Sequence, residues 1–356
     1  MKVLHLMTGG GIGGIQTLIE QYSEYSKCEN VFIFAYNDGP CYTSLVNQGN
    51  RVYLLKGENA IRKAFSIVKI LKEEGPSVIV EHFCAPFLRL TLMLSKFVVP
   101  GIKTVIYQHH DAGEDGSNAF GIKRNIIRAI DGFICRQVDE IYAISYFIKK
   151  SLILNYGVKK EKIHVIYNGV DLKRFSSSKS KANEIIYVGR LVEGKGVQII
   201  LHALSQLKED YHFSIVGDGP YRDELEQLSE KLGIQSNITF YGSQKEVYNY
   251  LNDSSVFIHV PLLEEGFGIT VVEAMAAGTT IISTYSGGIP EIITDRLNGY
   301  MVNRNNIDSL AEQIRDVLLN YNSEENIKIR NQATVDSKKY SIEKYSEQLD
   351  ALLSTN

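Results

Sequence analysis

The alternation of short β-branched runs with longer amphipathic stretches is the feature that most constrains the fold of this chain. The alternation runs through the first half, stops at a polar run over residues 176–181, and then restarts. Such a chain forms a parallel sheet with helices on both faces, because each crossover between strands lays a helix on the sheet. We therefore predict an α/β protein with two Rossmann-like domains in tandem and a cleft between them.

The predicted elements can be given as residue ranges. In the first half, the expected strands are 2–7, 31–36, 51–54, 77–81, 104–108 and 140–144, and the expected helices are 15–26, 60–74, 87–97 and 120–136. In the second half, the expected strands are 184–188, 213–216, 237–240, 256–260 and 280–283, and the expected helices are 197–207, 221–232, 245–251, 269–277 and 309–319. A last amphipathic helix is expected over 341–353.

Composition excludes several classes of protein. The 356 residues are 44% hydrophobic and 22% charged, which suits globular domains rather than a disordered chain. The most apolar stretch, residues 88–99, contains Arg89 and Lys96, so we expect no membrane span. The four cysteines show no CxxC spacing, and the first residues do not form a signal peptide. These features favour a cytoplasmic protein without a metal ribbon or a disulfide framework.

The small net charge of −3 hides an asymmetry between the halves. Residues 1–175 carry 22 Lys and Arg against 16 Asp and Glu, whereas the remainder carries 16 against 25. A basic first half is typical of a surface or site that meets an anion, although ordinary variation in surface composition gives the same count.

A glycine-rich turn follows the first predicted strand. Gly9, Gly11 and Gly14 form a G-x-G-x-x-G pattern, and the next helix presents free N–H groups to a phosphate. One interpretation is a dinucleotide-binding turn, with Asp38 near the end of the second strand as its ribose acid. The second is a clamp for a diphosphate, and the third is a tight turn that binds nothing.

Two clusters in the second half follow predicted strands, at the sheet edge where open α/β sheets bind ligands. The first is Gly189-Arg190, followed five residues later by Lys195-Gly196, whose two cations can point at one diphosphate. The second is Gly217-Asp218-Gly219, a turn that lines a nucleotide or serves only as a turn.

A third cluster spans the start of a predicted helix. Glu265 stands in the loop, Glu273 stands one turn inside the helix, and Gly266 and Gly268 leave backbone amides open at its start. A phosphate fits on amides there, while the carboxylates suit sugar and ribose hydroxyls. The plain alternative is a helix whose acidic residues stabilise its N-terminus.

Together these motifs resemble the family 4 retaining glycosyltransferases of the GT-B fold. The resemblance covers essentially the whole chain and includes Gly13-Gly14, His110-Asp111 and residues 168–171. It implies an N-terminal acceptor-binding domain at 1–175 and a nucleotide-sugar-binding domain at 176–340. It also implies that a tail helix, 341–356, packs back on the first domain.

The resemblance also implies roles by position. Arg190 and Lys195 would neutralise the donor diphosphate, Glu273 would bind the ribose, and Glu265 would contact the donor sugar. His110 would lie near the transferred sugar, an assignment that rests on Asp111 because His109 forms a doublet with it. The remaining predicted donor-site residues, several through their backbone amides, are Gly13, Gly14, Gly189, Gly217, Gly266, Phe267, Gly268, Ile269 and Thr270.

The reaction implied is transfer of a sugar, with retention, from a nucleotide-diphosphate sugar to a glycan or lipid-linked acceptor. UDP-sugars are the commonest donors of this family, and bacterial surface polysaccharide synthesis is the expected pathway. The chain has no D-x-D motif, so we expect neither a metal nor another cofactor, with Arg190 and Lys195 in the metal's place. Nothing indicates a nucleic-acid partner.

The predicted helix 120–136 interleaves basic and apolar residues. Lys123, Arg124 and Arg128 place it at the membrane or acceptor side of the first domain. Such a helix suits an anionic leaflet on the inner face of the cell membrane. It equally suits an ordinary sheet-packing helix with a solvated basic face.

Rival functions remain from the sequence alone. A dinucleotide-dependent oxidoreductase would use the first glycine turn and would change its spectrum with a nicotinamide cofactor. A non-hydrolysing nucleotide-sugar epimerase of the same fold would convert the donor without an acceptor. A two-lobed sugar-binding protein would bind free sugar without a nucleotide.

Overall fold

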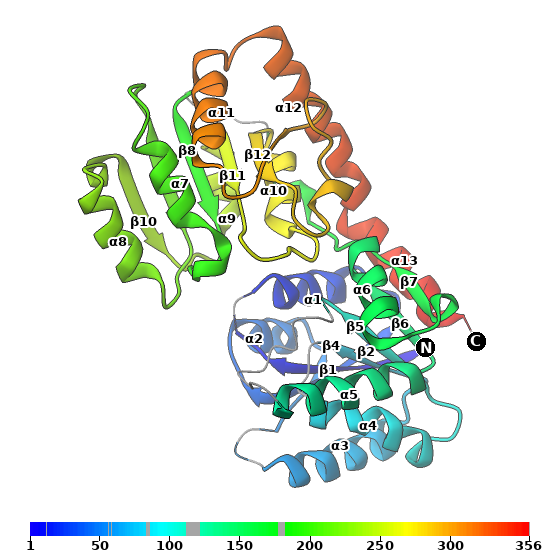
Figure 1. Cartoon of the computed structure of the whole chain (residues 1–356). Helices are drawn as coiled ribbons and strands as arrows, with labels where there is room; N and C mark the ends of the chain where they lie inside the picture. Colours follow the sequence, from blue (N-terminus) through cyan, green and yellow to red (C-terminus); the bar gives the residue numbers. More distant parts are fainter. Residues whose placement is uncertain are drawn as a thin grey trace. The chain divides into compact units, whose positions relative to one another are not determined.

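The computed structural model divides the chain into two compact units (Figure 1). It describes residues 1–11, 13–55, 57, 59–82, 86–111, 122–176 and 182–355. The first unit comprises 1–169 together with 342–356, and the second comprises 170–341. The units divide at Gly169–Val170, a few residues before the boundary at 175 that the sequence suggested.

The first unit is built on a seven-stranded parallel sheet in the order β3-β2-β1-β4-β5-β6-β7. Its strands are β1 (Lys2–Gly9), β2 (Glu29–Asn37), β3 (Arg51–Leu54), β4 (Val78–His82), β5 (Lys103–Gln108), β6 (Glu140–Ala143) and β7 (Ile163–Val165). Its helices are α1 (Gly14–Tyr25), α2 (Pro40–Asn47), α3 (Ala60–Glu74), α4 (Pro86–Val98), α5 (Ile122–Gln137), α6 (Tyr146–Tyr156) and α13 (Ile342–Ser354). The strand order reverses between β1 and β4, so their carboxyl ends flank the natural ligand crevice of this sheet.

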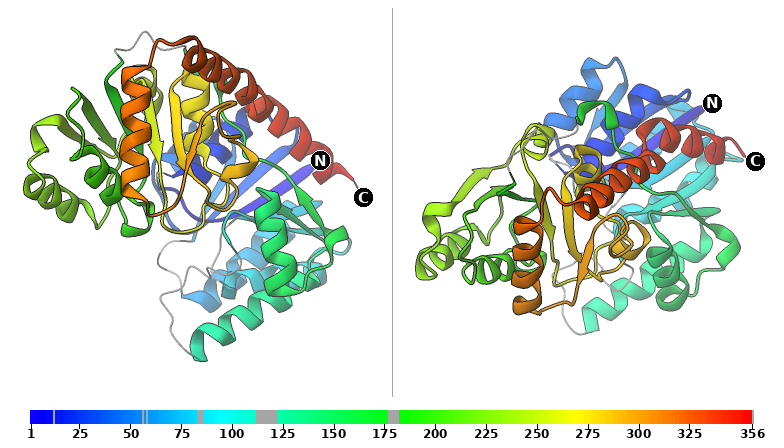
Figure 2. Two further views of the ribbon diagram at one scale, coloured as in Figure 1. Left: turned by 45° about the horizontal axis from the view of Figure 1, so that its top comes forward. Right: turned by 90° about the horizontal axis from the view of Figure 1, so that it is seen from above.

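The second unit repeats this design with six parallel strands in the order β10-β9-β8-β11-β12-β13. The strands are β8 (Glu184–Val188), β9 (His212–Val216), β10 (Ile238–Gly242), β11 (Val256–His259), β12 (Thr280–Thr284) and β13 (Tyr300–Val302). The helices are α7 (Val197–Leu204), α8 (Arg222–Lys231), α9 (Val247–Asn252), α10 (Ile269–Ala277), α11 (Ile307–Leu319) and α12 (Glu324–Ser337). Helix α7 packs against α11, and α10 packs against α9 and α12 (Figure 2).

Local sequence explains where several of these elements begin and end. The side chain of Asn59 accepts a hydrogen bond from the Arg62 N–H and so caps α3, and Ser145 caps α6 in the same way. Gly75 and Gly157 end these two helices in the left-handed conformation that glycine adopts without strain. The strands β1, β4 and β11 are buried along most of their length, as expected for strands covered on both faces.

Helix α13 belongs to the first unit, where it packs against α1. The Tyr22 hydroxyl donates a 2.6 Å hydrogen bond to Asp350 Oδ1, and the Lys27 N–H donates a 2.7 Å bond to Asp350 Oδ2. A Cβ at Gly169 would lie 2.7 Å from Tyr345 Cβ, so the helix and this turn are in direct contact. Across the described parts of the chain, no helix combines the length and apolar character needed to cross a bilayer.

Five observed elements have no counterpart in the sequence predictions: α2, α6, α12, β7 and β13. The two strands are three residues each, too short for a recognisable alternation. Helix α12 lacks a continuous apolar stripe because polar residues occupy part of its buried face. Asn326 there accepts a 2.7 Å hydrogen bond from the Tyr300 hydroxyl, and Asp336 accepts a 3.0 Å bond from Asn298 Nδ2.

Candidate functional site

In the second unit, the loops that follow β9, β8, β11 and β12 lie side by side, because these strands are neighbours in the sheet. Backbone hydrogen bonds tie the loops together. The Leu191 N–H donates to Asp218 O at 3.0 Å, the Leu262 N–H donates to Gly194 O at 2.9 Å, and the Gly288 N–H donates to Glu265 O at 2.8 Å. The four loops therefore form one continuous edge at the carboxyl ends of the strands.

Two glycines allow these loops to approach closely. Gly196 has a φ of +76°, and a Cβ there would lie 2.0 Å from the Val260 carbonyl oxygen. Gly217 has a φ of +139°, and a Cβ there would lie 1.9 Å from the Gly189 carbonyl oxygen. Packing of one loop on the next therefore requires these glycines whether or not a ligand is bound.

The structure brings Lys195 and Glu265 into direct contact. Lys195 Nζ lies 2.5 Å from Glu265 Oε2, and His259 Nε2 lies 3.5 Å from the same oxygen. Burial alone would raise the pKa of the Glu265 carboxyl, but the contact with His259 and the charge of Lys195 outweigh it and lower that pKa to about 2. Glu265 is therefore ionised at neutral pH and holds the lysine over the sheet edge.

Glu273 has different surroundings. It lies in α10, half-buried, and within the described residues its carboxyl has neither a hydrogen bond nor an ion pair. Burial raises its pKa to about 7, only partly opposed by the positive charge of Arg174. Its acceptor oxygens are thus unused, and the group changes protonation state near neutral pH.

Arg190 and the start of α10 complete this edge. Arg190 is exposed, its carbonyl accepts a 3.2 Å hydrogen bond from the Tyr187 hydroxyl, and its guanidinium forms no ion pair with any residue that the structure describes. Gly268 caps α10 with a φ of +93°, so the amides of Ile269 and Thr270 stand in the first turn, without intrahelical acceptors. Cationic and N–H donors are therefore both available to an anion here.

Phe267 belongs to the loop that leads into α10. Its side chain is buried and meets the Tyr340 ring edge-on, with 5.5 Å between ring centroids. The ring thus supports the loop that carries Gly266 and Gly268 from the core side.

Sequence reasoning missed two groups that position Glu265. His259 ends β11, and its place at a strand end was the available signal. Ser286-Gly287-Gly288 follows β12 as a fourth glycine turn at the same edge. The Glu265 N–H donates to Ser286 Oγ at 3.0 Å, and a Cβ at Gly287 would lie 2.0 Å from the Glu265 carbonyl oxygen.

In the first unit, the glycine turn after β1 is partly filled by its own neighbours. A Cβ at Gly9 would lie 1.8 Å from Asn37 Oδ1, and the Gly10 N–H donates to the Asn37 carbonyl at 3.1 Å. Nothing lies within 4 Å of a Cβ at Gly11, and Gly13 caps α1, whose first residue is Gly14. Of the motif glycines, Gly9 is therefore closely packed, whereas Gly11 has open space beside it.

Three buried histidines form a chain across the first sheet. His5 Nδ1 lies 3.0 Å from His82 Nε2, and His82 Nδ1 lies 3.4 Å from His109 Nε2. At the other end of the row, His5 Nε2 lies 3.1 Å from the Asn30 amide oxygen. Because an amide oxygen can only accept a hydrogen bond, His5 must carry its proton on Nε2 and accept on Nδ1. The same argument then places the proton of His82 and that of His109 on Nε2. Burial lowers the pKa of His5 to about 4 and that of His109 to about 3, and that of His82 well below its usual range.

The row of three histidines ends with His109 at the carboxyl edge of the sheet. His109 Nδ1 is left as an acceptor that is buried without a hydrogen-bond partner in the described structure. The next residue, His110, is half-buried, and its carbonyl accepts a 3.0 Å hydrogen bond from Gln108 Nε2. Asp111 accepts a hydrogen bond from Ser151 Oγ.

Arg89 fixes Gln108, although the sequence showed it only as an interruption of an apolar run. This buried arginine pairs with Glu81 at 2.9 Å and Asp131 at 3.4 Å and donates to Gln108 Oε1 at 3.2 Å. A charged residue on the inner face of an apolar helix was the signal for this cluster. Through the Gln108 amide, which also donates to the His110 carbonyl, the arginine helps to position His110.

The predicted membrane or acceptor side is described only in part. Arg128 is half-buried in α5, whereas the side chains of Lys123 and Arg124 lie outside the described residues. The exposed residues of α5 include the apolar Ile126, Ile130 and Phe133, together with Asn125, Arg136 and Gln137.

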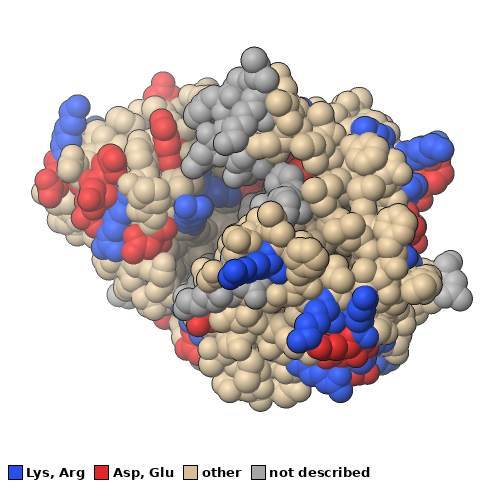
Figure 3. Space-filling view, turned by 90° about the horizontal axis from the view of Figure 1, so that it is seen from below, with Lys and Arg blue, Asp and Glu red and all other residues tan. Residues whose placement is uncertain are grey.

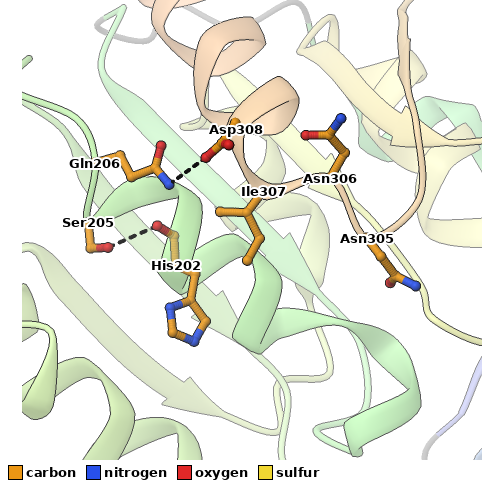
Figure 4. A pocket seen from close by; sticks show the side chains of 7 residues that line it. All are labelled: His202, Ser205, Gln206, Asn305, Asn306, Ile307 and Asp308. Carbon is orange, nitrogen blue, oxygen red and sulfur yellow. Dashed lines mark hydrogen bonds between the residues drawn. The ribbon is translucent and has the colours of Figure 1, made fainter.

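The second unit also has a hollow of about 480 Å³, lined by His202, Ser205, Gln206, Asn305, Asn306, Ile307 and Asp308 (Figure 4). It contains none of the predicted site residues, and Gln206 Nε2 donates to Asp308 Oδ1 inside it at 3.0 Å. In the described ranges of both units, no group of three or more His, Cys, Asp or Glu side chains is arranged to hold a metal ion.

Comparison with known proteins gives a consistent result. The family model described as Glycosyltransferase Family 4 matches residues 12–174, and that described as Glycosyl transferases group 1 matches residues 170–334. The uncharacterized glycosyltransferase MJ1178 of Methanocaldococcus jannaschii is 30% identical over 317 residues, which cover 87% of this chain and 86% of that protein. The phosphatidylinositol N-acetylglucosaminyltransferase gpi3 subunit of Schizosaccharomyces pombe is 27% identical over 198 residues, 53% of this chain and 43% of that protein.

Among solved structures, Anabaena Alr3699/HepE in complex with UDP-glucose superposes with a TM-score of 0.87. The sequence identity is 20%, and the match covers 99% of each chain. The fold predicted from the sequence, two Rossmann-like parallel-sheet domains of the GT-B type, is thereby confirmed.

Proposed function

This chain belongs to the family 4 glycosyltransferases, and from that premise we propose that it transfers a sugar, with retention, from a UDP-sugar to a glycan or lipid-linked acceptor. Family membership sets aside the oxidoreductase, epimerase and sugar-binding alternatives as the leading function. The uridine nucleotide is supported by the structure of the Anabaena relative, which is in complex with UDP-glucose. A role in bacterial surface polysaccharide synthesis completes the proposal, supported by a relative from Escherichia coli that is named for colanic acid biosynthesis.

The contact between Lys195 and Glu265 is the observation that carries this proposal. It joins a cation suited to a diphosphate with a carboxylate suited to sugar hydroxyls, at the sheet edge where such ligands bind. Since Glu265 stays ionised, it fixes the lysine before a donor arrives and reduces the entropy lost on binding. Glu273, with its unused oxygens, is suited to accept hydrogen bonds from the two ribose hydroxyls.

The chemical step breaks the bond between the sugar C1 and the diphosphate oxygen. Negative charge then grows on the leaving diphosphate, where Lys195, Arg190 and the first amides of α10 can stabilise it. The acceptor oxygen bonds to C1 from the same face, and its proton passes to the departing diphosphate oxygen. The anomeric configuration is thereby retained without a carboxylate nucleophile.

His110 is proposed to contact the transferred sugar from the first unit, with the amides near Gly13 and Gly14 directed to the phosphates. The packing of Arg89 on Gln108, and of Gln108 on the His110 carbonyl, would hold this histidine in position. The two basic groups would serve in place of a metal ion, so the reaction should need no divalent cation.

Binding and turnover assays test the proposal. In a thermal-shift panel of UDP-, GDP- and ADP-sugars, a UDP-sugar should stabilise the protein most, by about 2.7 kcal/mol at 100 times its Kd. Turnover of that donor should require an acceptor and should continue in EDTA. Conversion of the donor to its epimer without an acceptor would support the epimerase, and loss of activity in EDTA that Mg²⁺ restores would contradict the metal-free mechanism.

A further inference from the structure

The histidine row, formed by His5, His82 and His109, crosses the sheet of the first unit where its strand order reverses. His5 lies in β1, His82 ends β4 and His109 follows β5, and these strands are neighbours in the sheet (Figure 1). The reversal between β1 and β4 is the point at which open α/β sheets bind ligands. The row therefore leads from the interior of the unit to the edge that meets a ligand.

Packing holds the rings of the row in one orientation. His5 has no exposed surface, and its ring stacks on Phe32 with 5.0 Å between the ring centroids. The His109 ring lies 4.4 Å from the Tyr107 ring, and the Tyr107 hydroxyl donates to the Ile166 carbonyl at 3.3 Å. Rotation of a ring would require the surrounding core to repack. The places of the ring nitrogens are therefore fixed, and only the protons on them can differ.

Asn30 in β2 sets the direction of every hydrogen bond in the row. Its amide oxygen accepts from His5 Nε2 at 3.1 Å, so His5 Nδ1 accepts from His82 Nε2 at 3.0 Å. His82 Nδ1 then accepts from His109 Nε2 at 3.4 Å. The last nitrogen, His109 Nδ1, is a buried acceptor with no hydrogen-bond partner among the described residues. The side chain at one end thus decides whether the nitrogen at the other end accepts or donates.

A proton relay is the other use of a row of imidazoles, and the inner end of this row does not suit it. A relay needs a group that takes up the proton, and the Asn30 amide oxygen only accepts hydrogen bonds. Burial also lowers the pKa of His5 to about 4 and that of His109 to about 3, so these rings stay neutral. Charged side chains gather instead on the surface, as one face shows in Figure 3. The row is therefore suited to hold one arrangement of protons.

We propose that Asn30, His5 and His82 are positioning residues. They hold His109 in its Nε2-protonated form, so that His109 Nδ1 accepts a hydrogen bond from a sugar hydroxyl. Nearly all buried acceptors in native proteins are paired, and hydroxyls are the donors that a sugar offers. The identity of the ligand rests on the proposed function, whereas the arrangement of protons does not. The direction of this contact is set in β2, three strands away from β5.

Nitrogen-15 NMR of the histidine side chains in the full chain tests the arrangement of protons, because the two neutral tautomers give different nitrogen shifts. In the wild type at pH 7, all three members of the row should carry the proton on Nε2. Single variants, His5→Gln, His82→Gln and His109→Gln, identify the signals. A proton on Nδ1 of any of the three would overturn the proposal, and this measurement needs no substrate.

Two substitutions of Asn30 separate positioning from simple support of the fold. Asn30→Asp, as a carboxylate, keeps oxygens that only accept, so the Nε2 form and the kcat/KM of the wild type should be retained. Asn30→Leu has a similar size but no acceptor, so both tautomers should appear. The fall in kcat/KM should then follow the fraction lost, about twofold when half of the molecules change.

A merely structural role of Asn30 predicts the reverse order of these two variants, because a buried carboxylate costs more than a buried leucine. A single tautomer in Asn30→Leu, or an equal loss of activity in both variants, would overturn the proposal.

The hydroxyl contact is tested with UDP, with UDP-glucose, and with methyl glucoside added together with UDP. A shift of the His109 Nδ1 resonance with UDP-glucose places the hydroxyl on the donor sugar, and a shift only with methyl glucoside places it on the acceptor. A shift already produced by UDP, or none with any probe, would overturn the contact. These signals do not require turnover. A protein with the expected shift but without sugar transfer would therefore contradict the proposed reaction and not the role of the row.

Two substitutions of His109 complete the test. His109→Gln places an amide near the position of Nε2 and leaves nothing at that of Nδ1, whereas His109→Asn places its amide near Nδ1. We expect kcat/KM to fall by at least about tenfold in His109→Gln and by less in His109→Asn. His212→Gln is the control, since this half-buried histidine of β9 contacts Thr239 in the second unit and should be replaceable. Equal losses in the two His109 variants would overturn the assignment to Nδ1.

Discussion

The two sheets carry different groups at the strand ends where ligands bind in this fold. In the first unit, His5, His82 and His109 are buried as a chain of neutral rings whose pKa values burial has lowered. In the second unit, the edge carries an ionised Glu265 paired with Lys195, and a half-buried Glu273 with a raised pKa. The same strand arrangement therefore holds buried neutral rings in one unit and a charged lysine–glutamate pair in the other.

Lys195→Ala should lower kcat more than the other variants below, and it tests most directly whether the charged edge of the second unit takes part in the reaction. We expect kcat to fall by about 10²-fold or more, because a charge-assisted contact to the leaving group is lost. Steady-state kinetics with the preferred donor measures this, with the exposed Lys231→Ala as the control. Activity within a few-fold of wild type would remove Lys195 from the chemical step. Arg190→Ala provides the same test for the second cation.

Glu265→Gln should have the next largest effect on kcat. We expect kcat to fall by about tenfold or more while the affinity for UDP changes little, because contacts with the sugar strengthen as the ring gains charge. Calorimetry with UDP and kinetics with the donor separate the two quantities. Loss of UDP affinity with unchanged kcat would show that Glu265 holds the nucleotide instead.

Glu273→Gln should weaken UDP and donor alike, because the ribose is common to both. Its pKa of about 7 adds a pH dependence. If the ionised carboxylate binds the ribose, UDP affinity should fall as the pH drops below 7, by up to about tenfold per pH unit. In the Gln variant that dependence should disappear, leaving only the titration of the UDP phosphate. A profile identical to wild type would contradict the ribose role.

Acid stability does not report on the reaction but compares the whole units. Because the histidine pKa values are lowered in the fold, the unfolded state takes up protons first, and the first unit loses stability as the pH falls below 6.5. The slope is about 1.4 kcal/mol per histidine for each pH unit. Glu273 acts oppositely, since its raised pKa adds stability to the second unit as the pH falls from 7 toward 4.5.

Amide hydrogen exchange at pH 7 and pH 5.5, corrected for intrinsic rates, can follow both units in one sample. Protection should fall in the buried strands β1 and β4 and should hold or rise in β8 and β11. Equal losses in the two units would mean that the histidine chain does not control acid stability.

The sequence was informative where a motif is local. The loops with Arg190, Lys195 and Glu265 follow clear apolar strands, so their position at a sheet edge could be predicted. The 2.5 Å contact between Lys195 and Glu265 could not, because it joins side chains 70 residues apart. Nothing in the periodicity indicates which rotamer of a flexible lysine is held.

The sequence was less informative where a charged residue is buried or an apolar residue is exposed. Arg89 is almost fully buried and Phe97 is almost fully exposed, although they belong to the same short helix. The contacts between the three histidines could not be predicted from the sequence either, because these residues come from three different strands or strand ends. Phe267 was assigned to the donor site from the resemblance of its Gly-Phe-Gly segment, which does not reveal that its ring packs in the core.

The position of α13 determines the order in which this protein is completed during synthesis. The second unit is continuous in sequence and has its last residue, Ser341, before the chain ends. The first unit begins to emerge from the ribosome earlier, yet Tyr22 and Ser26 must wait for Asp350, which is more than 300 residues downstream. The unit that is translated first therefore gains its last helix only after the whole of the second unit has been translated.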